Sequence, residues 1–385
     1  MKILITHFFS KKNKGDAAIN TVLVHELKKK YPKAHIVLSS TDAFAPGERF
    51  EGVLFVSSIL YEALYVSVHP VTRILRTLYV LVASLLWVLT KKRTYVPDGL
   101  RGFLEALSTA DLVVPTGGSY LMASSSIQSN IVLILQLWPI FLAKLLNKKV
   151  VMYAQSIGPF ENGFGRTSAR YVLDTVASIE AREPITKAIL LALGVNKPTI
   201  TVSADAAFLF SSKFKKTMKE FLNKKGATDS KIKVGITVKR CYDDIRQEKY
   251  EKSIGGLVQH LIEKYDAQVI FVPQCTSTLH NDDDRVVSRA IVKSMQSPKN
   301  VFLLEDEFDH YHIKSLFENL DYLVATRMHS AIFAITGHVP TLAIAYEHKT
   351  KGTMEALGLS KWCIDLADVN FTSLTQKFDA LYENN

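Results

Sequence analysis

Two residues near the C-terminal end of the chain have the types and spacing for anion binding and acid–base chemistry. Arg327 stands between a predicted strand at 322–325 and a predicted helix at 329–336, and His329 is the first residue of that helix. An arginine fork pairs with carboxylate or phosphate, and a helix start adds backbone N–H groups and a positive dipole end. A histidine titrates near neutral pH, as a group that gives and later receives a proton should. The spacing indicates an anion seat with a proton donor beside it; a surface ion pair for Arg327 and a structural role for His329 are the alternatives.

A repeated alternation of strands and helices must position these residues. Short apolar runs rich in β-branched residues alternate with longer helical patterns, which is typical of a parallel sheet covered on both faces. The predicted strands cover residues 2–6, 35–39, 112–115, 149–154, 178–181, 233–238, 268–273, 301–304, 322–325 and 341–345. The predicted helices cover residues 17–30, 130–149, 250–265, 283–295, 313–319 and 329–336.

The alternation starts again after a polar stretch, which divides the chain in two. We expect an N-terminal domain over 1–212, a linker over 213–231 and a C-terminal domain over 232–385. The expected fold class is α/β, with two doubly wound Rossmann-like domains facing a cleft, as in the glycosyltransferase-B architecture. Ligands of such sheets bind beyond the carboxyl ends of the strands, so the loops that follow the strands should line the cleft.

Composition and charge exclude several classes of protein. The net charge of +10 favours anionic partners, but the basic residues form short scattered clusters without a nucleic-acid motif, so we expect no nucleic acid. Cys241, Cys275 and Cys363 lie far apart and lack zinc spacing, which argues against disulfides and a structural metal. The chain begins with a strand instead of a signal peptide, so we expect a cytoplasmic protein.

Two apolar helical segments, 71–93 and 130–149, do not follow the alternation. The first has basic residues on both sides, and its apolar stretch at 78–89 is short for a membrane span, which needs ~20 residues. The simpler interpretation is that both are core or interdomain helices. The alternative is an interfacial patch, apolar with basic flanks, that docks the protein on the inner leaflet of the cytoplasmic membrane.

A series of motifs, read in order over about residues 1–360, resembles the polysaccharide pyruvyltransferase family. The motifs are NKGDAAI (13–19), TGGSYL (116–121), YAQSIGP (153–159), ARE (181–183), SADAAF (203–208), GITV (235–238), FVPQ (271–274), DDD (282–284) and ATRMHSAIFA (325–334). The last is the most specific. At 182–183 the family more often has Arg-Asp, whereas this chain has Arg-Glu.

The resemblance implies a two-domain enzyme that moves the enolpyruvyl carbons of phosphoenolpyruvate onto two hydroxyls of a sugar, giving a cyclic pyruvate ketal and phosphate. The Arg-x-His pair that the family ties to donor binding and catalysis falls on Arg327 and His329. We expect the donor on the C-terminal domain and the acceptor on the N-terminal one. The apolar segments favour a polyprenyl-diphosphate-linked sugar, such as a galactose unit, over a free oligosaccharide acceptor.

Because phosphoenolpyruvate carries two acid groups, its site needs a second cation. Arg182 follows a strand of the first domain, and Lys239 with Arg240 follows strand 233–238 and is its rival. His348 follows strand 341–345 and could contact phosphate or acceptor, while Ser330 belongs to the same helix start as His329. A solvated surface position is the alternative for Arg182 and for His348.

Five further residues are candidates for substrate binding. Gly117 and Gly118, followed by Ser119, come just after a strand, where glycine lets backbone N–H groups approach a ligand. Gln155 begins the loop expected after strand 149–154. Asp16 could bind a sugar hydroxyl, although capping the following helix is its expected role. A plain tight turn is the alternative for the glycines, and no GxGxxG motif indicates a dinucleotide.

The aspartates at 282–284 invite a metal hypothesis, but Asp283 and Asp284 are better explained as negative charge at a helix start. We therefore expect no metal and no cofactor. One rival function is a glycosyltransferase of the B-type fold that uses a nucleotide sugar, but residues 328–337 contain no carboxylate to bind the ribose, and Glu347 is the only one nearby. The other rival is a non-catalytic, membrane-associated assembly factor, which would not need Arg327 beside His329.

Overall fold

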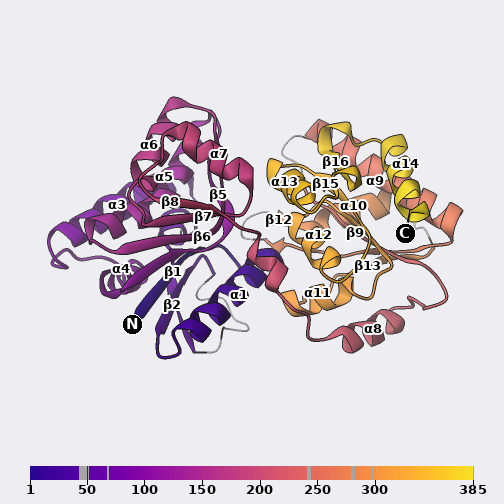
Figure 1. The fold of residues 1–385 in the computed structure, drawn as a ribbon, viewed down its shortest axis with the longest axis horizontal. Coiled ribbons are helices and arrows are strands. Elements are labelled where there is room, and N and C mark those ends of the chain that lie inside the picture. Colours follow the sequence, from indigo (N-terminus) through magenta and orange to yellow (C-terminus); the bar gives the residue numbers. More distant parts are fainter. Residues whose placement is uncertain are drawn as a thin grey trace. The chain divides into compact units, whose positions relative to one another are not determined.

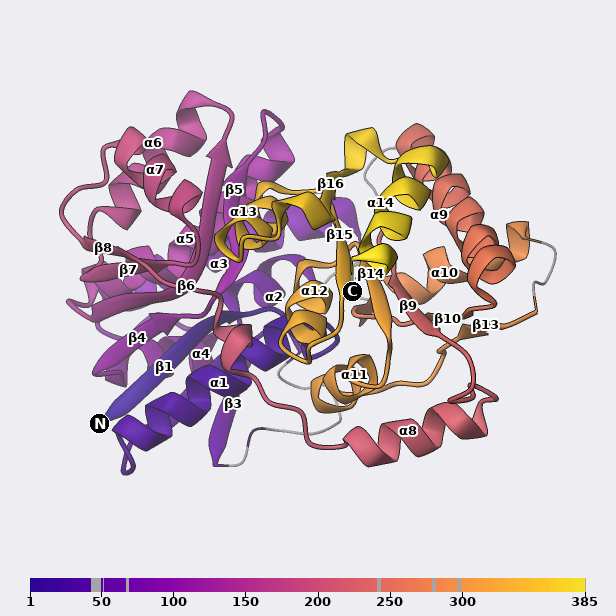
Figure 2. The ribbon, with the colours of Figure 1, turned by 45° about the vertical axis from the view of Figure 1, so that its right-hand side comes forward.

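The computed structural model describes residues 1–42, 50, 52–66, 69–240, 244–278, 282–295 and 299–384. The chain forms two compact units, which Figures 1 and 2 show as ribbons. Unit 1 consists of Met1–Lys11 and Ile19–Ala206, and unit 2 consists of Lys12–Ala18 and Ala207–Asn385. The segment 12–18 therefore packs with unit 2, although the chain on both sides of it belongs to unit 1.

Unit 1 is built on a sheet in which all strand pairs are parallel, with the order β3-β2-β1-β4-β6-β7-β8 and with β5 paired to β6. Its strands are β1 (Lys2–Phe8), β2 (His35–Ser40), β3 (Val53–Ser57), β4 (Leu112–Pro115), β5 (Gly118–Ala123), β6 (Lys149–Phe160), β7 (Ser178–Ala181) and β8 (Thr199–Val202). The chain starts in the middle of this sheet and winds outward in both directions. This doubly wound order places the topological switch point between β1 and β4.

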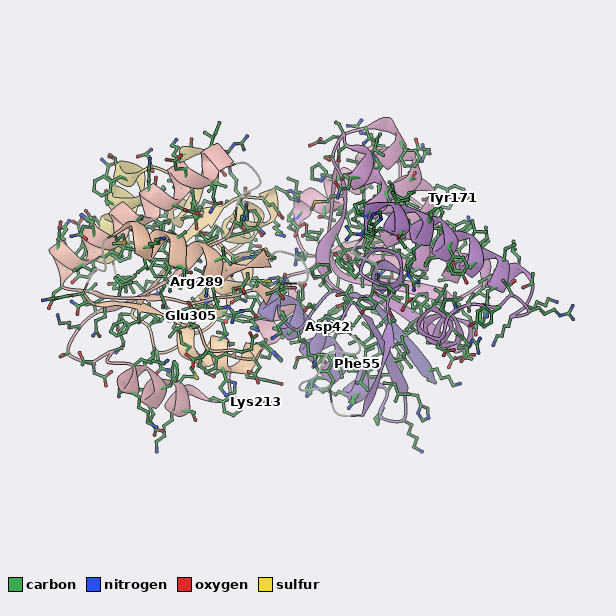
Figure 3. The ribbon with its side chains drawn as sticks, turned by 180° about the vertical axis from the view of Figure 1, so that it is seen from behind. Asp42, Phe55, Tyr171, Lys213, Arg289 and Glu305 are labelled. Carbon is green, nitrogen blue, oxygen red and sulfur yellow. The ribbon has the colours of Figure 1, made fainter. Side chains whose placement is uncertain are left out.

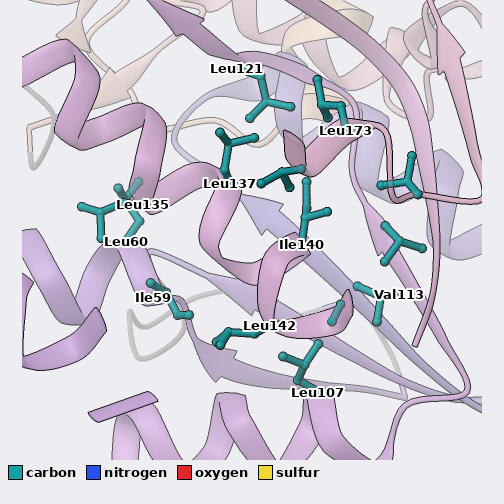
Figure 4. Close-up of a cluster of buried hydrophobic side chains, with 14 of the residues drawn as sticks. Ile59, Leu60, Leu107, Val113, Leu121, Leu135, Leu137, Ile140, Leu142 and Leu173 are labelled. Carbon is teal, nitrogen blue, oxygen red and sulfur yellow. The ribbon is translucent and has the colours of Figure 1, made fainter. Parts of the chain in front are cut away.

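The helices of unit 1 cover the sheet. They are α1 (Lys14–Lys30), α2 (Ile59–Leu64), α3 (Pro70–Leu89), α4 (Asp98–Thr109), α5 (Ile127–Leu145), α6 (Gly163–Leu173) and α7 (Pro184–Leu193). The first five residues of α1, 14–18, belong to unit 2. Helix α5 supplies the centre of the core, where Leu137, Ile140 and Leu142 pack among Leu107 of α4 and Val113 of β4 (Figure 4). One side of the apolar segment predicted at 130–149 therefore belongs to the core.

Helices α3 and α5 are both long and apolar enough to cross a membrane by length and composition. In α5, 44% of the apolar window is buried within the unit, against 28% in α3. Near its C-terminal end α5 contacts α6, where Lys144 Nζ lies 4.4 Å from the ring centre of Tyr171, which Figure 3 labels. Helix α3 buries one side, including Val80 and Trp87, and exposes the other.

Unit 2 has a second parallel sheet with the order β13-β10-β9-β14-β15-β16. Its strands are β9 (Lys233–Thr237), β10 (Gln268–Phe271), β13 (Val301–Leu303), β14 (Tyr322–Ala325), β15 (Thr341–Ala345) and β16 (Cys363–Asp365), and β11 (Thr276–Ser277) pairs antiparallel with β12 (Asp282–Asp283). Its helices are α8 (Lys215–Lys224), α9 (Asp244–Tyr265), α10 (Asp284–Ser294), α11 (His310–Phe317), α12 (Met328–Ile335), α13 (His348–Ala356) and α14 (Phe371–Glu383). The switch point of this sheet lies between β9 and β14.

Helices α9 and α14 pack on each other and on the core of unit 2, whereas α11 packs with α8 and α12. On the outer surface, Arg289 of α10 forms an ion pair of 2.7 Å with Glu305, which follows β13 (Figure 3). The α/β class and the doubly wound order that we predicted are thus confirmed for each unit.

The structure differs from the sequence prediction at three places near candidate residues. Strand β6 continues to Phe160, so the loop predicted after residue 154 is a strand. Helix α1 begins at Lys14, three residues earlier than predicted. The segment 213–231, expected as a linker, contains α8 and belongs to unit 2, and the chain passes from unit 1 to unit 2 at Ala206–Ala207.

Of the cysteines, Cys275 is buried and Cys363 half-buried, and both are free thiols. Cys241 lies outside the described residues.

Candidate functional site

The carboxyl ends of β9 and β14 bring several predicted residues together at the switch point of unit 2. The strands are paired, with Ala325 beside Thr237. Lys239 follows β9, while Arg327 follows β14 and is the N-cap residue of α12. His329 and Ser330 lie in the first turn of that helix. The predicted group of a cation, an imidazole and a helix start is therefore assembled at one edge of one sheet.

The guanidinium of Arg327 is buried and binds two carboxylates of the same unit. Its Nη1 and Nη2 donate to the two oxygens of Asp282 at 3.0 and 2.5 Å. Its Nη2 and Nε donate to Asp284 Oδ1 at 2.5 and 3.2 Å. Burial opposes the charge of Arg327, but Asp284 and Asp282 outweigh burial and raise the pKa of Arg327 well above its ordinary value. The fork that we predicted to hold a substrate anion is thus occupied by protein carboxylates.

Asp284 links this ion pair to the loop after β10. The other oxygen of its carboxylate, Oδ2, accepts hydrogen bonds from the backbone N–H groups of Gln274 at 3.0 Å and Cys275 at 2.9 Å. Asp283 points elsewhere, since it caps α10 by accepting from the N–H of Arg285 and also binds the guanidinium of that residue. The helix-start role that we expected fits both Asp283, the N-cap residue of α10, and Asp284, which lies in its first turn. The role of Asp282 and Asp284 as partners of Arg327 was not foreseen.

Lys239 is the second cation at this edge. Its Nζ lies 3.5 Å from Asp282 Oδ1 and 5.1 Å from the ring centre of Tyr346. Burial and the neighbouring charge of Arg327 lower the pKa of Lys239, although Asp282 works in the opposite direction. Burial also disfavours the ionised form of Asp282, but Arg327 and Lys239 outweigh this and hold the pKa of Asp282 below its usual range.

Buried polar groups without partners belong to the same strand end, helix start and loop as these charges. The Ser330 hydroxyl, the Thr237 hydroxyl and both polar atoms of the Gln274 amide have no hydrogen-bond partner within the part of the chain that the structure describes. All three side chains are at most 1% exposed. Because a buried polar group left unpaired costs free energy, such groups indicate a position that a ligand or water completes.

Two further candidates lie at the rim of unit 2. Arg240 is exposed, in contrast to the half-buried Lys239. His348 is the first residue of α13, next to the N-cap residue Glu347, which forms an ion pair of 2.6 Å with Lys349. Of the neighbouring cations Lys239 and Arg240, Lys239 is the one that lies beside Asp282, the partner of Arg327.

In unit 1, Arg182 is buried and not on the surface. Its Nη1 donates to Asp205 at 2.7 Å and its Nε to Ser156 at 2.6 Å. Glu183, also buried, accepts from the hydroxyls of Ser156 and Thr186. The surface alternative considered for the pair 182–183 is wrong. Arg182 instead belongs to a closed network in which Asp205 neutralises its charge.

The glycine-rich segment of unit 1 is part of the sheet. A Cβ atom on Gly117 would lie 2.7 Å from the carbonyl oxygen of Ala154 in β6, so the glycine permits close contact between strands. Gly118 and Ser119 begin β5 and do not form a turn. Gln155 lies inside β6, and its Nε2 donates to the carbonyl of Pro115 at 3.0 Å.

Asp16 lies in the first turn of α1, whereas the side chain of Asn13 accepts from the N–H of Gly15 at 3.1 Å and caps the helix. The capping role expected for Asp16 thus belongs to Asn13. Among the residues that the structure describes, no three His, Cys, Asp or Glu side chains are grouped for a metal ion.

Comparison with known proteins decides the family. The polysaccharide pyruvyl transferase family matches this sequence over residues 13–348. The chain belongs to that family. The amylovoran biosynthesis protein AmsJ of Erwinia amylovora is 26% identical over 300 residues, which are 76% of this chain and 70% of that protein. This polysaccharide pyruvyl transferase is thus an enzyme of polysaccharide biosynthesis, as the motif series implied.

Solved structures show the same fold at low identity. UDP-GlcNAc 2-epimerase of Methanocaldococcus jannaschii aligns with 100% of this chain and 92% of its own, with a TM-score of 0.58 and 14% identity. Anabaena Alr3699/HepE, solved in complex with UDP-glucose, aligns with 100% and 90%, with a TM-score of 0.56 and 11% identity. A glycosyltransferase of Rickettsia africae aligns with 99% of this chain and 88% of its own, with a TM-score of 0.55 and 12% identity. The pyruvyl transferase therefore has a glycosyltransferase-B-like fold.

Proposed function

We propose that this pyruvyl transferase moves the enolpyruvyl carbons of phosphoenolpyruvate onto two hydroxyls of a lipid-linked sugar. C3 of the donor gains a proton and becomes a methyl group. C2 forms bonds to two sugar oxygens and loses its bond to the phosphate oxygen. Of the two hydroxyl protons, one restores the acid and the other leaves with phosphate. The product is a cyclic pyruvate ketal.

The observation that carries the proposal is a pair of unpaired buried hydroxyls: Thr237 ends β9, two residues before Lys239, and Ser330 lies in the first turn of α12. Ser330 and Thr237 offer donors, and the first N–H groups of α12 add the positive end of the helix dipole. A carboxylate or phosphate would complete these donors and meet the charge of Lys239. In this proposal Arg327 does not bind the donor itself. It positions Asp282 and Asp284, and Asp282 in turn lies beside Lys239.

His329 is the proposed acid. It lies in the first turn of α12, so it projects from the same short segment as Ser330. A group that protonates C3 must give a proton and then take one up, which an imidazole can do because its ring nitrogens serve as donor and acceptor. General acid–base catalysis of this kind contributes on the order of 10²–10⁴-fold in rate.

Unit 1 offers polar groups for the acceptor. The hydroxyls of Thr116 and Ser119 and the Oε1 atom of Gln155 have no hydrogen-bond partner within the described ranges. Thr116 directly follows β4, Ser119 lies in β5 and Gln155 lies in β6. Such groups recognise hydroxyls well, because a site with unpaired polar atoms discriminates against ligands that cannot pair with them. We propose that they contribute to sugar binding.

The test uses the purified chain, phosphoenolpyruvate and a panel of polyprenyl-diphosphate-linked sugars, with UDP-sugars as alternative donors. Phosphate release and product mass are followed together. The expected result is one phosphate for each product that has gained a pyruvylidene group, with loss of turnover in His329→Ala. His338→Asn is the matched control, since His338 is exposed beyond the other end of α12. Turnover of a UDP-sugar without consumption of phosphoenolpyruvate would refute the proposal.

Helix α3 supports the lipid-linked acceptor. Several large apolar side chains on its outer side are more than half exposed: Val71, Ile74, Leu75, Leu78, Val82 and Leu89. The exposed Lys91, Lys92 and Arg93 follow the helix, and residues 69–95 contain no acidic side chain. An apolar helix face with a basic end fits an anionic bilayer surface, where each cation contributes about 1 kcal/mol. We propose that α3 lies on the inner leaflet and brings the enzyme to its acceptor.

Vesicle sedimentation tests this docking surface. The protein should bind vesicles of phosphatidylglycerol and phosphatidylcholine, bind weakly to phosphatidylcholine alone, and lose binding in the variant Ile74→Gln/Leu78→Gln. The control Ile185→Gln/Leu191→Gln removes two exposed apolar side chains from α7 and should bind as the native protein does. Loss of a dimer, instead of loss of vesicle binding, in the α3 variant would show that a second copy covers this face.

A further inference from the structure

The segment Lys12–Ala18 lies early in the chain but packs with unit 2. It is fastened to the loop that follows β10. Asn13 forms an antiparallel bridge with Cys275, the N–H of Lys14 donates to the carbonyl of Gln274 at 3.1 Å, and the N–H of Thr276 donates to the carbonyl of Lys12 at 3.0 Å. The same loop donates two backbone N–H groups to Asp284, the partner of Arg327. The segment is therefore joined to the candidate site through backbone hydrogen bonds.

The side chain of Lys14 fixes this segment a second time. Its Nζ is buried and lies 3.0 Å from Glu307 Oε1 and 3.3 Å from Thr276 Oγ1. Burial lowers the pKa of Lys14, although Glu307 partly opposes this. Lys12 also reaches Glu307 Oε1 at 3.0 Å, but its side chain is 47% exposed, against 3% for Lys14. Of the two lysines, Lys14 is the one that anchors the turn.

Gly15, which follows, lies against the imidazole of His329. A Cβ atom on Gly15 would lie 2.1 Å from His329 Nδ1, 2.3 Å from Cγ and 2.7 Å from Cβ. These distances are far below van der Waals contact, so any side chain at position 15 would have to displace the ring. Gly15 lies in the first turn of α1, and its backbone does not have the left-handed conformation that would itself require glycine. Close contact with His329 therefore explains the glycine.

We propose that Gly15 is a positioning residue for His329, and that the turn Asn13–Gly15, anchored by Lys14, forms the wall that sets the orientation of the imidazole. The inference rests on the proposed function in that His329 is the acid of the reaction. The reaction requires the ring to reach C3 of the donor, and a displacement of about 1 Å in such a group can reduce the rate on the order of 10²-fold.

The kinetic test is Gly15→Ala. We expect kcat to fall at least about 10-fold, while KM for phosphoenolpyruvate changes less than about threefold, because the substitution moves the acid and not the anion seat. The matched control is Gly256→Ala in α9, where the new Cβ would meet the ring of Phe371 at 2.7 Å. That ring is half exposed and can move, so kcat should stay within twofold of the native value.

A second pair of variants adds no atoms beside His329. Lys14→Met releases the anchor and should lower kcat several-fold, whereas Lys12→Met removes the exposed partner of the same carboxylate and should leave kcat unchanged. If Gly15→Ala fails to fold, the difference in kcat between Lys14→Met and Lys12→Met tests the positioning role of the turn. Equal effects of the two lysine variants, or a KM change as large as the kcat change, would overturn the inference.

Spectra separate failure of this inference from failure of the proposed function. In NMR spectra of protein labelled at histidine, the ring resonances of His329 should shift in Gly15→Ala but not in Gly256→Ala. This comparison needs no substrate, so it does not depend on which reaction the enzyme catalyses. Unchanged His329 resonances would refute the positioning role even in an active enzyme. Shifted resonances in a protein that does not consume phosphoenolpyruvate would instead refute the proposed function alone.

Discussion

Replacing Arg327 by alanine should destabilise unit 2 as well as abolish turnover. The guanidinium binds Asp282 and Asp284, and the side chain of Asp284 is fully buried, whereas that of Asp282 is 25% exposed. Without Arg327, Asp284 becomes a buried carboxylate that has lost the cation bound to it. Removal of one partner of a buried ion pair typically costs about 3–5 kcal/mol. For a unit of this size, that loss corresponds to a fall in Tm of roughly 6–20 °C.

Urea unfolding followed by tryptophan fluorescence measures this loss in one unit. Trp362 is the only tryptophan of unit 2, so a background with Trp87→Phe and Trp138→Phe isolates its signal. Adding Asp284→Asn to Arg327→Ala should recover at least about 1 kcal/mol relative to the sum of the single changes, because the neutral amide needs no cation.

The opposite result would refute the reasoning. If Arg327→Ala unfolds within about 1 kcal/mol of the native protein and still loses turnover, the guanidinium contributes its binding energy to substrate and not to the two aspartates. The sequence-based role of Arg327 as a direct ligand of the donor would then stand.

Two other predictions concern unit 1. Burial lowers the pKa of His7 to about 4, although its bond to the carbonyl of Gln136 opposes this; the folded state thus prefers the neutral ring. This contribution is complete above pH 6.5 and is lost as the pH falls towards 4, by up to about 3 kcal/mol. Asparagine tolerates the left-handed backbone of position 7, where φ is +70°. In His7→Asn, the free energy of unfolding measured with urea should therefore fall less between pH 6.5 and pH 4 than in the native protein. Gly117→Ala should destabilise the unit by about 1–3 kcal/mol in the same assay, because of its contact with β6, whereas Gly163→Ala, which meets nothing within 4 Å, should not; equal effects would contradict the packing argument.

Local patterns in the sequence were sufficient for most of the fold. Strands β4, β7, β14 and β15 have the predicted bounds, because buried parallel strands form short apolar runs between helical patterns. Strand β6 was predicted too short, since Gly158 and Pro159 normally indicate a turn. The pairing of β6 with β5 and β7 overrides that local signal.

The contacts of the candidate site were harder to predict, because they join distant parts of the chain. The motif correctly brought Arg327, His329 and Ser330 to one helix start. Nothing local indicates that Asp284 pairs with Arg327, which lies 43 residues further along the chain. The contact of Gly15 with His329 joins the first and last motifs of the series. A glycine within a helix start was the available signal, because glycine is unfavourable there unless something packs closely against it.

The balance of charge at the switch point of unit 2 leads to a last prediction. Arg327 and Lys239 contribute two positive charges, and Asp282 and Asp284 two negative ones, so a donor with a carboxylate and a phosphate meets a nearly neutral seat. Asp282 is the more exposed of the two carboxylates, and it binds Arg327 as well as Lys239, the cation that the donor would meet. Asp282→Asn should therefore lower KM for phosphoenolpyruvate by about fivefold, or about 1 kcal/mol. Asp283→Asn is the control, because Asp283 binds Arg285 instead. A higher KM in Asp282→Asn would show that Asp282 holds the cations in place and does not compete with the donor.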